Sequence, residues 1–246
     1  MDMQNNSEGP AFHIIHIRQK DAMERAESIP ELENNTLHLW TARYSDLDHF
    51  YGIFSDFLSQ TEQKKASTFR KPADARRYSL RHGMVRFILG TYTRTSPGRV
   101  PLVTGRNGKP ELDLQPHDDQ TITFSVSHTD EILSIGVMKK FEIGIDIVKI
   151  DPRYPVLEIA EYLFCPREIS YLQGTRPDQR ESIFFTFWSM KEAIIKTTGE
   201  GLHGIQETDV MNILLNHTKP KDFFMCPFIP APGYRGAVAV CVSGEK

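Results

Sequence analysis

The sequence predicts an α+β fold, because helical and extended patterns come in blocks and not in strict alternation. Apolar residues recur at helical spacing in four segments, at 46–59, 73–93, 156–172 and 178–198. Short β-branched runs lie close together and fit a three-stranded meander, at 121–126, 132–138 and 143–148. Further strands are expected at 13–17, at 37–40 and near the end of the chain at 236–242.

Composition narrows the classes of protein. The chain has 246 residues, which suits one large domain or two of about 120 residues each. A net charge of −3 argues against a globally basic nucleic-acid-binding protein. Three cysteines are too few for a disulfide framework, and no apolar run is long enough for a transmembrane helix. The first ten residues are polar, so we expect a disordered tail at 1–10 and no signal peptide there. We therefore expect a cytoplasmic protein that binds neither membranes nor nucleic acids.

Asp146 is the first candidate functional residue, because it interrupts an apolar strand at 143–148. A buried carboxylate is costly unless it has a partner. Asp146 therefore either pairs with a structural cation or binds a metal ion.

Glu192 and Lys196 form the second candidate, one turn apart on the predicted helix at 178–198. They are either an exposed ion pair, worth a few tenths of a kcal/mol, or a second metal carboxylate with a cation placed for a polyphosphate.

The third candidate is Ser127-His128, where a strand enters a turn. The pair fits a phosphate contact, a nucleophile with its base, or a surface turn without a role. The turn around Lys109 lacks the hydroxyl residue of a Walker loop, so this lysine has no role by pattern alone. A basic cluster that includes Lys65 and Arg77 is either a solvated helix face or a site for phosphate or an acidic partner.

The order of these motifs is more specific than any one of them. Together, Asn-Gly-Lys-Pro at 107–110, Phe-x-x-Ser-His at 124–128, Gly-Ile-Asp at 144–146 and Trp-Ser-x-Lys-Glu-Ala-x-x-Lys at 188–196 resemble the Sfp-type 4′-phosphopantetheinyl transferase family, over about residues 37–205. The resemblance implies a monomer of two similar α+β halves, 11–142 and 143–246, related by a pseudo-two-fold axis. Coenzyme A and Mg²⁺ (or Mn²⁺) would bind in the cleft between the halves.

The resemblance also implies an activity. A serine hydroxyl of an apo acyl, peptidyl or aryl carrier protein attacks the β-phosphate of coenzyme A, and 3′,5′-ADP leaves. Such carriers serve fatty-acid, polyketide or non-ribosomal peptide biosynthesis. Two alternatives are a catalytically idle module that binds coenzyme A or a carrier, and a metal-dependent phosphohydrolase with Asp146, His128 and Glu192 as ligands.

Residue roles follow from the same resemblance. Asp146 and Glu192 would hold the metal, and Glu192 would also accept the serine proton, directly or through water. Lys196 and Lys191 would stabilise the pyrophosphate. The residues implied to bind coenzyme A are Lys65, Arg77, Lys109, Ser127, His128, Lys191 and Lys196. Many relatives carry a third acidic ligand where this chain has Val148, so Thr129 or water is expected to complete the metal shell. Glu168 matches a family acid whose role is structural.

Overall fold

The computed structural model describes residues 13–18, 29–105, 108–113, 121–198, 206, 208–211 and 223–242. The tail expected at 1–10 lies outside these residues. Among the helices described, none is long and apolar enough to cross a membrane.

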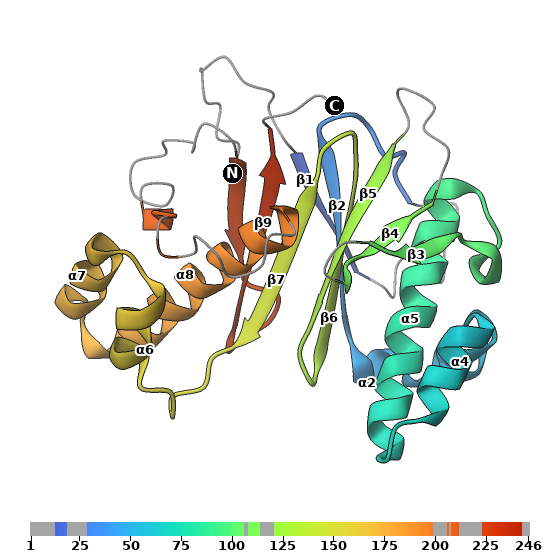
Figure 1. Ribbon diagram of the computed structural model, residues 1–246, viewed down its shortest axis with the longest axis horizontal. Helices are drawn as coiled ribbons and strands as arrows, with labels where there is room; N and C mark the ends of the chain where they lie inside the picture. Colours follow the sequence, from blue (N-terminus) through green and yellow to red (C-terminus); the bar gives the residue numbers. More distant parts are fainter. Residues whose placement is uncertain are drawn as a thin grey trace.

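The first half is built on a four-stranded sheet in the order β1-β2-β6-β5. Its strands are β1 (His13–Arg18), β2 (Thr36–Arg43), β5 (Ile122–His128) and β6 (Ile132–Lys139). β1 pairs parallel with β2, and the other pairings are antiparallel. The long helix α5 (Pro72–Thr93) covers the outer face of this sheet, with α4 (Gln60–Ser67) beyond it (Figure 1). A small hairpin, β3 (Leu102–Thr104) and β4 (Pro110–Leu112), lies beside them.

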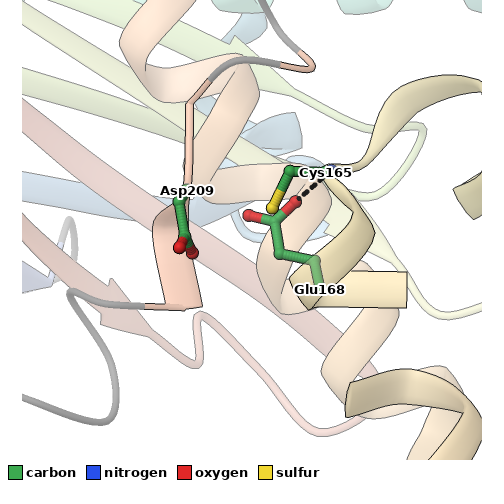
Figure 2. A group of neighbouring side chains, drawn as sticks. All are labelled: Cys165, Glu168 and Asp209. Carbon is green, nitrogen blue, oxygen red and sulfur yellow. Dashed lines mark hydrogen bonds between the residues drawn. The ribbon is translucent and has the colours of Figure 1, made fainter. Parts of the chain in front are cut away.

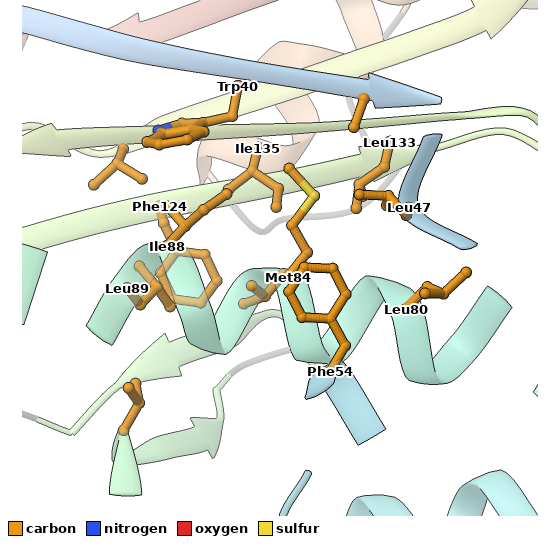
Figure 3. Packing of buried hydrophobic residues seen from close by; sticks show 14 of the residues in the cluster. Trp40, Leu47, Phe54, Leu80, Met84, Ile88, Leu89, Phe124, Leu133 and Ile135 are labelled. Atoms are coloured by element: carbon orange, nitrogen blue, oxygen red, sulfur yellow. The ribbon is translucent and has the colours of Figure 1, made fainter. Parts of the chain in front are cut away.

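The core of the first half fills the space between its sheet and α5. Figure 3 shows Met84, Ile88 and Leu89 of α5 below Trp40 and Ile135 of the sheet. Side chains alternate between the two faces of a strand, and in β2 the even-numbered residues face α5. The odd-numbered residues of β2 pack on the other face, against the second sheet.

The second half carries a three-stranded sheet in the order β7-β9-β8. Its strands are β7 (Ile143–Lys149), β8 (Phe223–Phe228) and β9 (Tyr234–Cys241). Helix α8 (Pro177–Thr198) packs on the outer face, beside α6 (Val156–Leu163) and α7 (Pro166–Gly174) (Figure 1).

The two halves repeat one topology. In each, a strand is followed by a 22-residue helix and then by two antiparallel strands, the later of which lies at the centre of the three. The order β2-β6-β5 therefore corresponds to β7-β9-β8. This repeat places α5 and α8 on opposite outer faces, and an apolar cluster from β2, β6, β7 and β9 packs between the sheets.

The three-stranded meander predicted at 121–148 is wrong. β7 pairs with β9 in the second sheet instead of extending β6. β7 nevertheless lies against β5, because the hydroxyls of Ser125 and Ser127 accept the N–H groups of Ile145 (3.0 Å) and Ile147 (3.1 Å). Serine side chains thus replace backbone carbonyls at the junction of the two sheets.

Two predicted helices are interrupted. The segment 46–59 is divided among α2 (Tyr44–Leu47), a 3₁₀ turn (Asp48–Phe50) and α3 (Tyr51–Asp56). The segment 156–172 is divided between α6 and α7 because Pro166 occupies the first turn of α7, where a proline starts a helix and cannot continue one.

Candidate active site

Three polar side chains meet at the junction of the halves. The carboxylate Oδ1 of Asp146 accepts hydrogen bonds from Lys196 Nζ (2.7 Å) and Ser127 Oγ (3.1 Å). Lys196 Nζ also donates to Ser127 Oγ (3.0 Å). The side chain of Asp146 is 10% exposed and that of Lys196 is 32% exposed, so the pair lies at the rim of the core and is open to solvent on one side.

Strand alternation and one glycine bring these groups together. Even-numbered residues of β7 face α8, so Gly144 and Asp146 share that face. A Cβ at Gly144 would lie 1.9 Å from the carbonyl oxygen of Ala193 and 2.5 Å from Thr197 Oγ1, both on α8. Only a residue without a side chain permits this approach, and the approach lets Lys196 of α8 reach Asp146.

Glu192 lies one turn before Lys196 on α8 and is half-buried. Burial, and then the negative charge of Asp146, raise the pKa of the Glu192 carboxyl, while Lys196 opposes this shift. Within the described part of the chain, the Glu192 carboxylate forms no hydrogen bond or ion pair. Two carboxylates that disfavour one another's charge are a donor set that a hard divalent cation would stabilise. Asp146 and Glu192 therefore fit Mg²⁺, although Lys196 already occupies one oxygen of Asp146.

Thr129 does not fit the third ligand position. Its hydroxyl oxygen accepts the backbone N–H groups of Glu131 (3.2 Å) and Ile132 (3.0 Å) and thereby closes a turn. A hydroxyl has two acceptor lone pairs, and both are used here. The side chain of Val148 packs with apolar residues of the second half, which leaves water as the remaining alternative.

His128 points away from this centre. Neighbouring residues of a strand face opposite sides, so His128 lies on the α5 side of β5, where the Arg81 guanidinium contacts its Nε2. Partial burial of the ring, followed by the charge of Arg81, lowers the pKa of His128 to about 4. Because arginine only donates, Nε2 must accept and the imidazole is neutral. Arg81 lies one turn after Arg77 on α5, and no motif of the sequence distinguishes it from the other arginines of that helix.

Arg77 reaches the same region from α5. It pairs with Asp130 (2.6 Å), next to the turn after β5, and with Asp74 (3.1 Å). The carboxyl of Asp130 is almost fully exposed. An incoming phosphate could therefore replace Asp130 at Arg77 without leaving a buried charge.

The structure does not bring Lys65 and Lys109 to the Asp146 centre. Lys109 donates to Glu142 Oε2 (3.2 Å) and to the carbonyl of Ile143 (3.3 Å), at the start of β7. Lys65 is exposed on α4, over the ring of Phe69. Phe69 in turn contacts Tyr78 of α5.

The expectation that Lys191 contacts the pyrophosphate is wrong for this structure. The side chains of Lys191 and Glu168 are both 0% exposed and form an ion pair (3.0 Å). Lys191 Nζ also donates to the carbonyl of Thr208 (2.5 Å). Lys191 is adjacent to Glu192 in sequence, but the 100° turn per residue directs it into the core of the second half. Helical spacing alone could not decide which lysine faced the site.

Glu168 is the hub of this structural cluster. Its two carboxylate oxygens accept the backbone N–H groups of Cys165 (3.0 Å) and Val210 (2.8 Å). Figure 2 shows Cys165, Glu168 and Asp209 close together, an arrangement that could hold a metal ion. The ammonium of Lys191 beside Glu168 already neutralises the carboxylate, so the cluster is a helix-capping device and not a metal site.

The geometry points to a class of protein with two topologically repeated α+β halves, and with two carboxylates and several basic side chains where the halves meet. Comparisons with known proteins agree. Residues 142–237 match the model of the 4′-phosphopantetheinyl transferase superfamily.

Among curated relatives, the chain is 29% identical to 4′-phosphopantetheinyl transferase HetI of Nostoc sp. strain PCC 7120, over 87% of this chain and 91% of that protein. It is 30% identical to 4′-phosphopantetheinyl transferase ffp of Bacillus subtilis, over 62% of this chain and 70% of that protein. It is 32% identical to 4′-phosphopantetheinyl transferase Sfp of Bacillus subtilis strain 168, over 61% of this chain and 63% of that protein. The chain belongs to the 4′-phosphopantetheinyl transferase superfamily, which confirms the resemblance seen in its motifs.

Proposed function

We propose that this protein transfers the 4′-phosphopantetheine arm of coenzyme A to a serine hydroxyl of an apo acyl, peptidyl or aryl carrier protein. The reaction is Mg²⁺-dependent and releases 3′,5′-ADP. The observation that carries the proposal is the convergence of Asp146, Glu192 and Lys196 at the junction of the halves. We further infer that the protein acts as a monomer, because the second half repeats the first and can complete the site within one chain. We also propose a cytoplasmic location, in line with three cysteines that are too few for a disulfide framework.

The residues divide the work as follows. Asp146 and Glu192 would hold Mg²⁺, which supplies charge neutralisation at the pyrophosphate when bound. Lys196, exposed on one side, donates to a pyrophosphate oxygen and stabilises the negative charge that develops on the leaving group. Ser127 keeps Lys196 and Asp146 in position through its hydroxyl.

The transfer step balances simply. The serine oxygen of the carrier forms a bond to the β-phosphorus, and the bond from that phosphorus to the bridging oxygen breaks. The electron pair leaves with 3′,5′-ADP. The serine proton goes to Glu192, directly or through a water molecule. Partial burial raises the pKa of the Glu192 carboxyl, which suits a carboxylate that accepts a proton.

The alternatives find less support. A phosphohydrolase that uses His128 as a metal ligand would need Nε2 free of the Arg81 cation that contacts it. An idle binding module would not need both carboxylates and Lys196 assembled at one point.

Mass measurement of a carrier tests the proposal. Purified protein, coenzyme A and Mg²⁺ are mixed with apo acyl, peptidyl and aryl carriers, with and without EDTA. We expect one carrier class to gain a single phosphopantetheine arm, with stoichiometric 3′,5′-ADP, and EDTA to abolish the gain. Asp146→Asn should abolish transfer, while Asp151→Asn, a matched change at a surface ion pair, should not. Coenzyme A hydrolysis without carrier modification would refute transfer and favour the phosphohydrolase.

A further inference from the structure

Strands β5 and β7 meet at the candidate active site but share no backbone ladder. β5 pairs with β6 in the first sheet, and β7 pairs with β9 in the second. Within the described part of the chain, the hydrogen bonds between β5 and β7 come only from the hydroxyls of Ser125 and Ser127. This junction of the halves therefore depends on side chains at two positions of one strand.

The two serine contacts lie on either side of Asp146 in β7. Backbone groups of alternate residues in a strand point to opposite edges, so the N–H groups of Ile145 and Ile147 point to β5 while Asp146 pairs with β9. Ser125 Oγ accepts the first N–H (3.0 Å) and Ser127 Oγ accepts the second (3.1 Å). Asp146 therefore lies between two residues whose amides are held by the first half.

Ser125 differs from Ser127 in its distance from the chemistry. Ser127 Oγ also contacts Asp146 (3.1 Å) and Lys196 (3.0 Å), so its loss would disturb the site directly. Ser125 is 5% exposed, and among the described residues its hydroxyl is hydrogen-bonded to the amide of Ile145 alone. Ser125 thus joins the halves without contacting the groups proposed to bind the metal ion or the pyrophosphate.

The side chain of Ile145 is also seated in the first half. Gly136 of β6 lies opposite Ser125 in the first sheet, and a Cβ at Gly136 would lie 2.2 Å from Ile145 Cδ1. The missing side chain leaves the space that the fully buried Ile145 fills. Because a buried N–H group without an acceptor is costly, loss of the Ser125 hydroxyl would favour movement of Ile145 out of this seat, together with the adjacent Asp146.

We propose that Ser125 is a positioning residue, which aligns the metal carboxylates of the second half with the part of coenzyme A bound by the first half. The inference rests on the proposed function for the identity of the metal ion and of the substrate. Asp146 and Glu192 belong to the second half, whereas Arg77, which can accept a phosphate, belongs to the first. These groups can act on one bound pyrophosphate only if the halves keep a fixed separation, and the contact from Ser125 to Ile145 sets that separation beside Asp146.

Metal titrations with and without coenzyme A test this role. The dissociation constant of Mn²⁺ is measured by electron paramagnetic resonance in the wild type, Ser125→Ala, Ser125→Thr and Ser79→Ala. Loss of a group behind a metal ligand weakens binding by roughly 10- to 100-fold. We expect this loss in Ser125→Ala only when coenzyme A is bound, because the metal carboxylates lie within one half, and we expect recovery in Ser125→Thr, which keeps the hydroxyl. The matched control Ser79→Ala removes an equally buried serine, whose hydroxyl donates to Ala75 within α5, and should bind Mn²⁺ as the wild type does.

A loss of the same size without coenzyme A would overturn the proposal, because it would place the effect within the second half. Unchanged affinity with coenzyme A, or an equal loss in Ser79→Ala, would overturn it as well. If Ser125→Ala does not fold, Ser125→Cys takes its place, since a thiol fills a similar space and is only a weak acceptor. A wild type that binds Mn²⁺ more tightly with coenzyme A, and a Ser125→Ala variant that loses this gain, would support the role of Ser125 even if no carrier is modified. The absence of carrier modification would then refute the proposed function alone.

Discussion

The buried ion pair of Lys191 and Glu168 should stabilise the fold and take no direct part in catalysis. Both side chains are 0% exposed, and Glu168 also accepts two backbone N–H groups that hold α7 and the segment at 210 in place. Lys191→Met removes the ammonium but keeps most of its volume. The variant would leave Glu168 as an uncompensated buried carboxylate, which costs about 3–5 kcal/mol of unfolding free energy.

That cost is large against the total stability. A domain of this kind is stable by about 5–15 kcal/mol, and each kcal/mol lost lowers the melting temperature by about 2–4 °C at this size. We therefore expect Lys191→Met to melt roughly 6–20 °C below the wild type. The control Lys149→Met breaks an exposed ion pair with Glu131, which solvent screens, and should leave the melting temperature close to that of the wild type.

A double-mutant cycle identifies the partner. Lys191→Met combined with Glu168→Gln should be less destabilised than the sum of the single changes by about 1–3 kcal/mol, because the double variant has no unpaired buried charge. Urea unfolding measures the free energies, and the KM for coenzyme A should stay within a factor of two or so of the wild-type value in the folded fraction. An unchanged melting temperature with a raised KM would refute this reasoning, because it would show that Lys191 contacts coenzyme A and does not stabilise the fold.

Three further expectations follow from the same structure. Asp146→Asn should lower transfer by more than about a hundredfold, since a metal at a phosphoryl group supplies several kcal/mol of charge stabilisation, and a steady-state rate with normal thermal stability checks it. Gly144→Ala should lower the free energy of unfolding by about 1–3 kcal/mol and lower transfer as well, because its Cβ would overlap the carbonyl of Ala193 at 1.9 Å and push α8 away from Asp146. Urea unfolding measures the first effect and the steady-state rate the second, and wild-type values for both would contradict this expectation. Burial alone would raise the pKa of Glu62, but hydrogen bonds from His82, Arg86 and the Ser59 backbone outweigh it and lower the pKa from 4.5 to about 2. The unfolded chain thus takes up this proton first, so up to about 3 kcal/mol of stability is present above pH 4.5 and is lost as the pH falls towards 2. The urea midpoint of the wild type should therefore exceed that of Glu62→Gln at pH 7, and the two midpoints should come close together at pH 3.

Local patterns were enough for the elements that show strong periodicity. The expected helices at 73–93 and 178–198 are observed as α5 and α8, and the last strand is observed as β9. The family also followed from the order of the motifs, and three residues of those motifs, Asp146, Glu192 and Lys196, lie together in the structure. Strand β8 escaped prediction because its run of Phe, Met, Cys and Pro carries no clear alternation.

What the sequence alone determined, then, was the identity of the elements and of the chemical groups, since both depend on the period of neighbouring residues and on residue type. Which groups meet was decided only by the tertiary structure. Helical rotation turned Lys191 into the core beside Glu168 and left Lys196 at Asp146, although both lysines belong to one motif. Strand alternation sent Ser127 and His128 to opposite faces, and so brought Arg81 from a helix 47 positions away to His128. Contacts of this kind depend on the packing of distant segments, which no local pattern encodes.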